Sequence, residues 1–266
     1  MSQQLTALER ETGRSLLTRT GRRVSLTPAG IVLVEHAEAV LADLERAEAA
    51  LAATDEGPSG SVRLGAFPTA LRMVVLPAMV RIARAERDME LTVTEVDPAE
   101  VPDLLRAGQL DIALVHEYDN VPSAMGSGIE LEPLLDEVVY LASPTAPNLP
   151  DNELIHNHCR SNWIVGKPGT LCHTMTVRTC QSHGFEPRIA HRVDDFAMVL
   201  RLVAAGAGVA LVPRFGTIEV PEGVVLTALP ISRRTRIAYR RGSRSRPAFA
   251  AVSAELHRAA RSFRGS

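Results

Sequence analysis

Residues 27–54 carry an uninterrupted helical pattern, and this stretch constrains the fold of the chain more than any other. Thr27 suits the N-cap position and Pro28 the first helical position. After Gly30, no proline or glycine occurs until Gly57. The pattern therefore predicts one long helix over residues 27–54.

The apolar residues of this helix repeat in steps of four and three, which is the spacing of a coiled-coil seam. The seam consists of Leu33, Ala37, Val40, Leu44, Ala47 and Leu51. Such a seam needs a partner helix, so we expect a homodimer through residues 28–54, with a tetramer as the alternative. The competing interpretation is a helix packed on its own domain, which usually shows a wider apolar stripe.

The segment DEGPSGS, residues 55–61, breaks the helical pattern and predicts a hinge. Beyond it, strands and helices alternate in two sets, which is typical of parallel sheets in an α/β fold. The first set has strands at 62–67, 91–96 and 111–115 with helices at 69–86 and 98–107, and the second has strands at 163–165, 189–193 and 209–212 with helices at 170–183 and 196–205.

Two α/β sets of this kind predict two lobes. Residues 138–142 form a strand that can cross from one lobe to the other, and residues 235–240, followed by a helix at 247–263, can return the chain to the first lobe. Lobes joined in this way enclose a cleft at the C-terminal ends of their strands, where small ligands usually bind.

The formal net charge of −2 hides a strong segregation of charge along the chain. Residues 1–30 carry five arginines against two glutamates, and residues 232–266 carry ten arginines against Glu255. Basic ends on an acidic body suggest a polyanion partner at one end. For the C-terminal run, the alternative is a solvated arginine tail.

Composition excludes several classes of protein. No apolar run is long enough to span a membrane, and the polar N-terminus does not resemble a secretory signal, so we expect a cytoplasmic protein without a membrane partner. Three cysteines fit a reducing compartment better than a disulfide framework. Because no Gly-rich phosphate loop, nucleophile elbow or paired-carboxylate motif occurs, we expect neither enzymatic activity nor a cofactor.

Three segments, in this order and with the heptad helix after the first, carry a resemblance to a known family. They are SQQLTALERETGRSLLTRTGRRVSLTPAG (2–30), LRAGQLDIALV (105–115) and GFEPRIAHRVDDFAMVLRLVAAGAGVALVP (184–213). By them the chain resembles LysR-type transcriptional regulators over essentially its whole length.

The resemblance implies three parts. Residues 1–30 would be the remnant of a winged helix-turn-helix, and residues 31–56 a linker and dimerisation helix. Residues 62–266 would form a two-lobed effector-binding domain similar to periplasmic binding proteins. Within that domain, lobe 1 would comprise about 62–140 plus 235–266, and lobe 2 about 141–231.

The resemblance also implies which residues contact DNA. Those of the recognition helix are Ser2, Gln3 and Gln4, and those of the wing are Arg19, Arg22 and Arg23. Arginine suits a wing because its fixed charge and fork of donors hold a phosphate, while the glycine turn lets the backbone approach closely. A solvent-exposed basic hairpin is the alternative for the three arginines.

The sequence departs from the family at its N-terminus, because the helices that should precede Ser2 are absent. Either the true start lies upstream, which is the hypothesis we prefer, or the chain is a truncated regulator. In the sequence as written, Leu5, Leu8, Leu16 and Leu17 would have faced the missing helices, which leaves an apolar patch exposed. Residues that read base edges come mainly from the missing part, so we expect impaired DNA binding: weak, salt-dependent and with little sequence discrimination.

The effector residues implied by the resemblance lie in two turns and at three strand ends. They are Phe67, Pro68, Thr69 and Ala70 in the first turn, Gly166, Lys167 and Thr170 in the second, and His116, Asp194 and Pro213 at the strand ends. Thr69 and Thr170 are predicted to cap helix N-termini, where free N–H groups favour an anion such as a carboxylate. Lys167, the only lysine, is the other candidate partner of an anionic effector, or is simply solvated.

Seven His and Cys residues fall within residues 156–183 and raise a metal site as an alternative. They are His156, His158, Cys159, Cys172, His173, Cys180 and His183. Their spacing is poor for four converging ligands, so no metal is expected. The alternative function to a DNA-binding regulator is a small-molecule binding module without DNA-binding activity.

Overall fold

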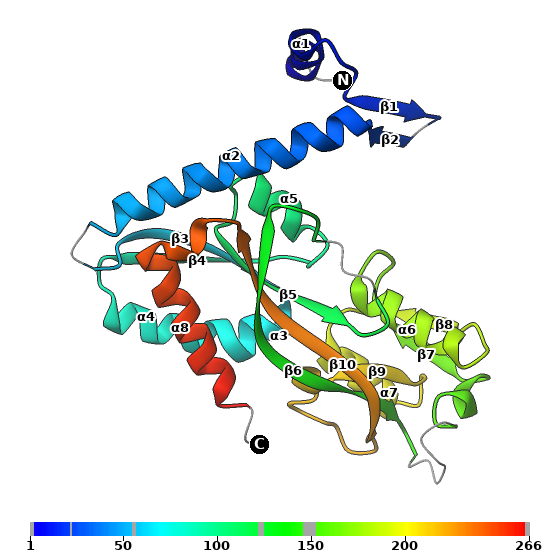
Figure 1. Cartoon of the computed structure of the whole chain (residues 1–266). Helices are drawn as coiled ribbons and strands as arrows, with labels where there is room; N and C mark the ends of the chain where they lie inside the picture. Colours follow the sequence, from blue (N-terminus) through cyan, green and yellow to red (C-terminus); the bar gives the residue numbers. More distant parts are fainter. Residues whose placement is uncertain (1–2, 22, 55–56, 122–124, 146–152, 264–266) are drawn as a thin grey trace.

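The computed structural model describes residues 3–21, 23–54, 57–121, 125–145 and 153–263. The chain begins with helix α1 (Gln3–Thr12) and an antiparallel hairpin of β1 (Leu17–Thr20) and β2 (Arg23–Leu26) (Figure 1). Gly21, with a φ of 63°, makes the turn between the two strands. The hairpin predicted as a wing over residues 19–26 is therefore present, and it begins two residues earlier, at Leu17.

Helix α2 (Pro28–Ala52) confirms the long helix predicted from the sequence. The Thr27 side chain caps its N-terminus by accepting a hydrogen bond from the Gly30 N–H at 3.0 Å. At Gly30 a Cβ would clash with the carbonyl oxygen of Leu16, so only glycine allows this close approach. The start of α2 thus covers Leu16, which is buried, and the prediction that Leu16 is exposed is wrong.

Helix α2 has two different faces. One face packs on the lobes through the buried Ala42 and Ala49, as the competing interpretation predicts. The opposite face carries the heptad seam, and its large residues remain exposed: Val40 by 59%, Leu44 by 56% and Leu51 by 71%. In Figure 1, α2 runs along the outside of the molecule. The helix therefore packs on its own chain and still leaves the seam free.

A six-stranded sheet with strand order β4-β3-β5-β10-β6-β9 forms the body of the molecule. Its strands are β3 (Gly60–Ala66), β4 (Met89–Glu95), β5 (Ile112–Tyr118), β6 (Ile129–Ser143), β9 (Ala210–Pro213) and β10 (Val225–Arg240). Strand β3 pairs in parallel with β4 and β5, as the alternating pattern predicts. Strand β10 is antiparallel to both β5 and β6.

Lobe 1 consists of β3, β4 and β5 with the helices that cover them. The first is a continuous helical run of α3 (Pro68–Ala70), a π-helical turn (Leu71–Val75) and α4 (Leu76–Ala85); the others are α5 (Val101–Arg106) and α8 (Pro247–Arg261). The π turn directly precedes Pro77, which lacks an N–H for the regular ladder. The main core lies between the sheet and helices α4 and α8, and a smaller core lies under α5.

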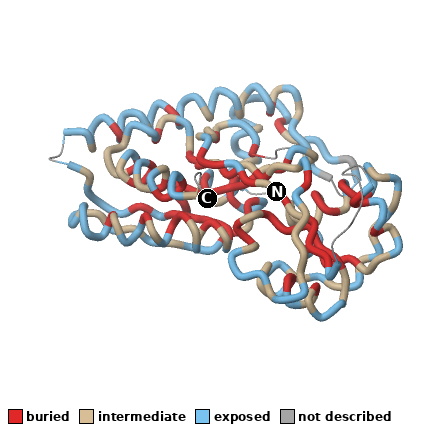
Figure 2. Tube along the Cα trace, turned by 90° about the horizontal axis from the view of Figure 1, so that it is seen from below, coloured by how far each residue is buried: buried red, intermediate tan, exposed pale blue. Residues whose placement is uncertain are grey.

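Lobe 2 consists of β7 (Asn162–Val165), β8 (Arg188–Arg192) and β9 with helices α6 (Leu171–Ser182) and α7 (Phe196–Ala204). Strands β7 and β8 are parallel, and a parallel bridge from Trp163 to Val209 links β7 to the start of β9. Trp163 is fully buried in one of two cores of this lobe. Figure 2 shows buried segments in both lobes. Three 3-10 turns complete the chain at His156–His158, Arg214–Gly216 and Ser243–Ser245.

The two lobes are joined by β6 and β10, which are 15 and 16 residues long. The predicted crossing strands 138–142 and 235–240 lie inside them, so the crossing is confirmed but each strand is much longer than predicted. Among the described residues, no helix combines the length and the apolar character needed to cross a membrane.

Most of the C-terminal arginines belong to β10, α8 or the turn between them and pair with acids of the chain. Eight of the ten form ion pairs within the chain: Arg233–Glu137, Arg234–Asp119, Arg236–Glu117, Arg240–Glu45, Arg241–Glu130, Arg244–Glu132, Arg246–Glu48 and Arg258–Glu255. The alternative of a solvated run is wrong for Arg233, which is 1% exposed, whereas Arg241, Arg244 and Arg258 pair with acids and still remain 57%, 69% and 62% exposed. The pairs form because β10 lies between β5 and β6, which carry many of the acidic partners. Charges segregated along the sequence are matched in space.

Candidate functional site

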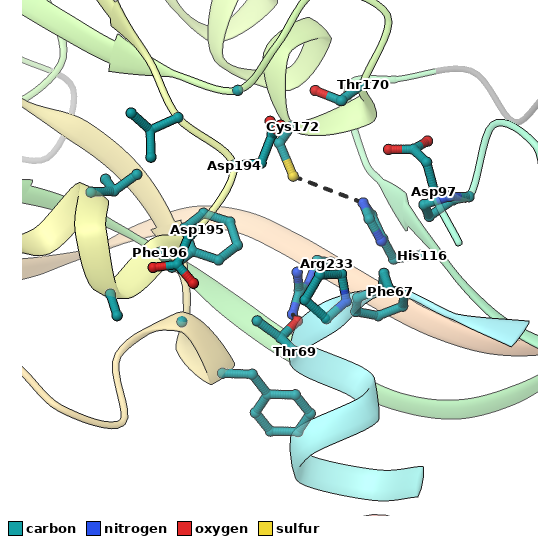
Figure 3. A pocket seen from close by; sticks show the side chains of 18 of the residues that line it. Phe67, Thr69, Asp97, His116, Thr170, Cys172, Asp194, Asp195, Phe196 and Arg233 are labelled. Carbon is teal, nitrogen blue, oxygen red and sulfur yellow. Dashed lines mark hydrogen bonds between the residues drawn. The ribbon is translucent and has the colours of Figure 1, made fainter. Parts of the chain in front are cut away.

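A cavity of about 380 Å³ lies between the two lobes, where the sequence predicts a cleft (Figure 3). Its walls come from the turns after β3, β4 and β8, from the C-terminal ends of β5 and β7, and from the starts of α6 and α7. Strand β10 contributes Arg233 to the cavity wall. Both lobes therefore supply residues to one enclosed space.

Seven of the ten predicted effector residues line this cavity and three do not. The seven are Phe67, Pro68, Thr69, His116, Gly166, Thr170 and Asp194. Ala70 faces the core of lobe 1 instead, and Pro213 is buried in β9, where it pairs with Val139. The Lys167 side chain is 71% exposed and pairs with Asp194 at 3.0 Å, so the only lysine is turned outward and is not merely solvated.

The two threonines predicted as helix caps behave differently. Thr170 caps α6 by accepting from the His173 N–H at 3.2 Å, and its hydroxyl donates to the Lys167 carbonyl oxygen. Thr69 does not cap its helix, because Pro68 already occupies the first position and the N-cap is Phe67. The Thr69 hydroxyl instead accepts a hydrogen bond from Arg233 at 3.0 Å. The Thr170 hydroxyl thus already donates within the chain, whereas the Thr69 hydroxyl only accepts and keeps its hydrogen for another partner.

A buried ion pair forms the floor of the cavity. The Arg233 Nε donates to Glu137 Oε1 at 2.6 Å, and both side chains are 1% exposed. Burial alone would lower the pKa of Arg233, but the Glu137 carboxylate raises it overall, so the guanidinium stays charged. The second oxygen of Glu137 accepts from the Phe215 N–H at 2.7 Å. The pair thus connects the Thr69 turn of lobe 1 with the Arg214–Gly216 turn beside lobe 2.

Sequence reasoning missed both members of this pair. Arg233 lies in a run of arginines that reads as exposed, and Glu137 lies in the part of β6 that was not predicted as a strand. The available signal was the apolar alternation around Arg233 between Ile231 and Ile237, which places every second residue of the run on a buried face.

His116, Tyr118 and Cys172 form a polar cluster beside the ion pair. The Tyr118 hydroxyl lies 3.3 Å from Cys172 Sγ, and His116 Nε2 lies 4.0 Å from the same sulfur. Burial, together with the charge of Arg233, lowers the pKa of His116 well below its usual range, so the imidazole is neutral. Burial raises the pKa of the Cys172 thiol as well. The cluster is therefore uncharged near neutral pH.

Acidic side chains dominate the charged groups of the cavity wall. Six carboxylates contribute to it: Glu95, Asp97, Glu100, Asp194, Asp195 and Glu219. The positive side chains in the wall are Arg72 and Arg233. Of these eight residues, the sequence analysis identified only Asp194.

The described DNA-contact candidates lie at the end of α2 far from the hinge (Figure 1). Gln3 and Gln4 occupy the first turn of α1, Arg19 lies in β1, and all three are exposed. Ser2 and Arg22 lie outside the described residues, and for Arg23 only the backbone in β2 is described. The described candidates are thus accessible to a partner.

The His and Cys residues between 156 and 183 do not converge. His156 Nδ1 lies 2.9 Å from the His183 carbonyl oxygen, and burial raises the pKa of the Cys180 thiol to about 12. Within the described ranges, no three His, Cys, Asp or Glu side chains are arranged to hold a metal ion, and all three cysteines are free thiols.

Comparison with known proteins agrees with this architecture. Residues 55–261 match the model of the LysR substrate binding domain, and residues 1–31 match that of the bacterial regulatory helix-turn-helix protein, lysR family. ShiR of Corynebacterium glutamicum, an HTH-type transcriptional regulator, is 31% identical over 91% of this chain and 83% of its own length. The "Probable hydrogen peroxide-inducible genes activator" of Mycobacterium avium is 30% identical over 80% of this chain and 68% of its own length.

Solved structures show the same fold. The Corynebacterium glutamicum OxyR C206 mutant superposes with a TM-score of 0.64 at 24% identity, covering 98% of this chain and 82% of that one. CbnR complexed with its target DNA superposes with a TM-score of 0.57 at 20% identity, covering 96% of this chain and 88% of that one. With a family model matching most of its residues, the chain belongs to the LysR family of transcriptional regulators.

Proposed function

We propose that this chain is a DNA-binding transcriptional regulator that senses a small organic effector in the cavity between its lobes. The observation that carries the proposal is the cavity itself, which takes its walls from both lobes and its floor from the strand that joins them. A ligand held there contacts seven of the residues expected from the sequence and also Arg233. No enzymatic step and no cofactor are needed for this role.

The signal would pass from the cavity to helix α2 along β10. Arg233 at the cavity and Arg240 beside α2 lie on this one strand, and Arg240 Nε donates to Glu45 of α2 at 2.5 Å. A ligand can shift the position of α2 only by as much as it prefers one arrangement over the other. Since each of the two arginines bonds a different element, a small movement of β10 would alter both contacts.

DNA binding would use the first 30 residues of each protomer in a dimer. We infer that Gln3 and Gln4 lie near base edges and that Arg19, with Arg22 and Arg23, contacts phosphates, while the exposed seam of α2 joins two copies. CbnR, a structural neighbour of this chain, has been solved in complex with its target DNA, and this complex is the precedent for the proposed DNA binding. For the chain as given, binding would be weak and strongly salt-dependent.

The sensing role is tested by following the melting temperature of the protein with a library of small metabolites. Ala197 lines the cavity, so Ala197→Phe should fill it and abolish any ligand-induced rise in Tm. Ala83, exposed on α4, gives the matched control Ala83→Phe, which should keep the response. A rise in Tm that survives Ala197→Phe would place the ligand elsewhere and contradict the proposal.

Gel-shift titrations separate the regulator from its alternative, a small-molecule binding module without DNA-binding activity. The regulator predicts retarded duplex DNA at low salt and a loss of binding in Arg19→Gln. If no retardation occurs at 20 to 50 mM salt, where phosphate contacts are strongest, the binding module is the correct assignment.

Peroxide sensing is a second candidate, because the names of the mycobacterial relative and the OxyR structures point to peroxide and Cys172 lines the cavity. Against it, burial raises the pKa of the Cys172 thiol, which lowers the fraction of reactive thiolate. Cys172 and Cys180 also stand eight residues apart in α6, about 12 Å along a helix axis. We therefore assign Cys172 to the cavity wall and expect Cys172→Ser to keep the ligand response.

A further inference from the structure

The charge of the cavity wall restricts what can bind there. Its six carboxylates face two guanidiniums, and one of these, Arg233, is already neutralised by Glu137 at 2.6 Å. Among the carboxylates, Asp194 is likewise neutralised, by Lys167. When Glu137 and Lys167 are included in the count, seven carboxylates stand against three positive side chains. The wall is thus negative before any ligand enters.

The negative groups come from both sides of the cavity. Glu95, Asp97 and Glu100 follow β4 in lobe 1, whereas Asp194, Asp195 and Glu219 belong to lobe 2 or the turns beside it. Figure 3 shows Asp97 on one side of the cavity and Asp194 and Asp195 on the other. Carboxylates that face each other across a cleft repel as the cleft closes, and a cation between them removes this repulsion.

Five of the six carboxylates form no ion pair in the described part of the chain, and three of these five accept no hydrogen bond there either. These three are Glu95, Glu100 and Glu219, all of them exposed. Asp97 and Asp195 are occupied differently, since they accept hydrogen bonds from the backbone N–H groups of Ala99 and Met198. Local turn geometry therefore accounts for two of the acids but leaves the other three available to a ligand.

A second, independent observation comes from His116. This residue lines the cavity, is 4% exposed, and its Nδ1 has no hydrogen-bond partner. Buried polar atoms are nearly always paired, so an unpaired one in a cavity wall indicates a ligand group. The neutral imidazole presents Nδ1 as a donor or as an acceptor according to its tautomer, so this atom indicates a polar ligand group while the carboxylates indicate its charge.

The rest of the wall is apolar and partly aromatic. Phe196 and Phe215 line the cavity, and Phe67 already lies under the Arg233 guanidinium at 5.1 Å. Aromatic faces attract organic cations as well as apolar groups. A metal ion is a poor occupant, since no three ligand side chains converge among the described residues. An organic cation needs no such convergence, because its charge is spread over a larger group.

We propose that the effector of this protein is a small organic amine, with a cationic ammonium group held by the carboxylates of the wall and an apolar body against the phenylalanines. This assignment rests on the proposed sensing role of the cavity and names the class of ligand. It replaces the anionic effector expected from the sequence, because the carboxylates of the wall outnumber its guanidiniums.

Matched probes that differ only in charge test the assignment. Benzylamine, benzyl alcohol and benzoate form one set, and butylamine, butanol and butyrate a second; binding is followed by the shift in Tm and by calorimetry. We expect binding among the amines, with an affinity that falls as salt rises from 20 to 200 mM, because salt screens charge. Binding of the carboxylates alone would overturn the amine assignment and leave the sensing role intact. If no probe of any charge binds, the amine assignment is overturned, and the sensing role is decided separately by the metabolite library with Ala197→Phe.

Variants of the unpaired acids provide the specific control. The triple variant Glu95→Gln, Glu100→Gln, Glu219→Gln should weaken amine binding about tenfold, since each side chain contributes one charge close to the ligand. Three acids outside the cavity give the matched control Glu86→Gln, Glu153→Gln, Glu222→Gln, with the same change of net charge and an expected effect below about twofold. Equal losses in the two triple variants would show a general effect of net charge and overturn the assignment.

Discussion

Two of the arginines in strand β10, Arg233 and Arg240, have different roles at the two ends of lobe 1. Arg233 is 1% exposed, bonds Glu137 at 2.6 Å and forms the floor of the cavity. Arg240 is 20% exposed, bonds Glu45 of α2 at 2.5 Å and also donates to the carbonyl oxygens of Leu105 and Leu110. One residue type on one strand thus builds both the ligand site and the attachment of the linker helix.

The difference lies in how much water surrounds each pair. In the buried pair, removal of one partner leaves an unpaired charge in a medium of low dielectric, which is expensive. At α2, Arg240 and Glu45 are 20% and 15% exposed and the neighbouring Glu48 is 60% exposed, so solvent and salt screen these charges more than those of the buried pair. We therefore expect a fixed junction at Arg233 and an adjustable one at α2, which suits a fold that must transmit a movement from the cavity to the helix.

Removal of Glu137 is expected to have the largest effect. Glu137→Leu would leave the Arg233 guanidinium charged and unpaired in the core, and would also leave the Phe215 N–H without its acceptor. The expected loss in the free energy of unfolding is about 3–5 kcal/mol, measured by urea denaturation.

The double variant Arg233→Met, Glu137→Leu shows whether this loss comes from the unpaired charge. With both charges gone and apolar groups in their place, most of the stability should return. A double variant as unstable as Glu137→Leu would mean that the pair itself, and not the isolated charge, sets the stability of the floor.

Gly242→Ala tests the attachment of α2 at the other end of the strand. Gly242 has a φ of 94°, and a Cβ there would clash with the Ala42 carbonyl oxygen of α2. We expect a loss of about 2–3 kcal/mol from strain and lost packing, with faster hydrogen exchange along α2 while the lobes stay protected.

Gly223→Ala is the matched control for this prediction. Gly223 has a similar φ of 82°, but a Cβ there would meet no atom within 4 Å. This variant measures backbone strain alone, at about 1 kcal/mol. The attachment of α2 would be unimportant if the two variants lost the same stability and the same protection of α2.

Asp111 lies at the Arg240 end of β10, with its carboxylate 3.8 Å from the Arg240 guanidinium, and gives a prediction on pH. Burial alone would raise the pKa of Asp111, but the hydrogen bonds from Arg63, at 2.8 and 2.9 Å, lower it overall. A lowered pKa in the folded state stabilises the protein above the ordinary Asp pKa of about 4, and this stability is lost as the pH falls through the folded value. Arg63 is half-exposed, so we expect a contribution of about 1 kcal/mol at pH 7.

Asp111→Asn should remove this contribution and its dependence on pH. Urea denaturation of both proteins between pH 2 and pH 7 should therefore give a difference that is constant above about pH 5 and shrinks below about pH 4. A difference that grows on acidification would have the wrong sign for a carboxylate with a lowered pKa.

Most of the fold could be predicted from the sequence because it follows from local patterns. Helix α2 is marked by Thr27, Pro28 and the absence of breakers, and β3, β4 and β5 by short apolar runs between helices. The prediction falls short for β6 and β10, whose length depends on pairing with each other across both lobes. Long-range pairing of this kind leaves only a weak local signal.

The candidate site was predicted only in part for a related reason. Turn residues such as Phe67 and Gly166 are tied to strand ends, so the pattern of strands locates them. Arg233 and Glu137 are 96 positions apart in sequence and meet only when β6 and β10 pair. Their charges also read as surface residues, since nothing local shows that each is neutralised by the other.

Arg246→Gln should have the smallest effect on the free energy of unfolding. It tests directly whether the ion pairs at α2 are weaker than the buried pair at the floor of the cavity. Arg246 pairs with Glu48 of α2 at 2.5 Å and also lies 4.0 Å from Glu45. Glu48 is 60% exposed, whereas Glu45, which Arg240 also bonds, is 15% exposed. Exposed pairs of this kind contribute about 0.2–0.5 kcal/mol, and salt weakens them further. Urea denaturation at 20 and 500 mM salt should show a small loss at low salt only. A loss above 1.5 kcal/mol that persists at high salt would mean that α2 is fixed as firmly as the floor of the cavity, and the proposed adjustable junction at α2 would be wrong.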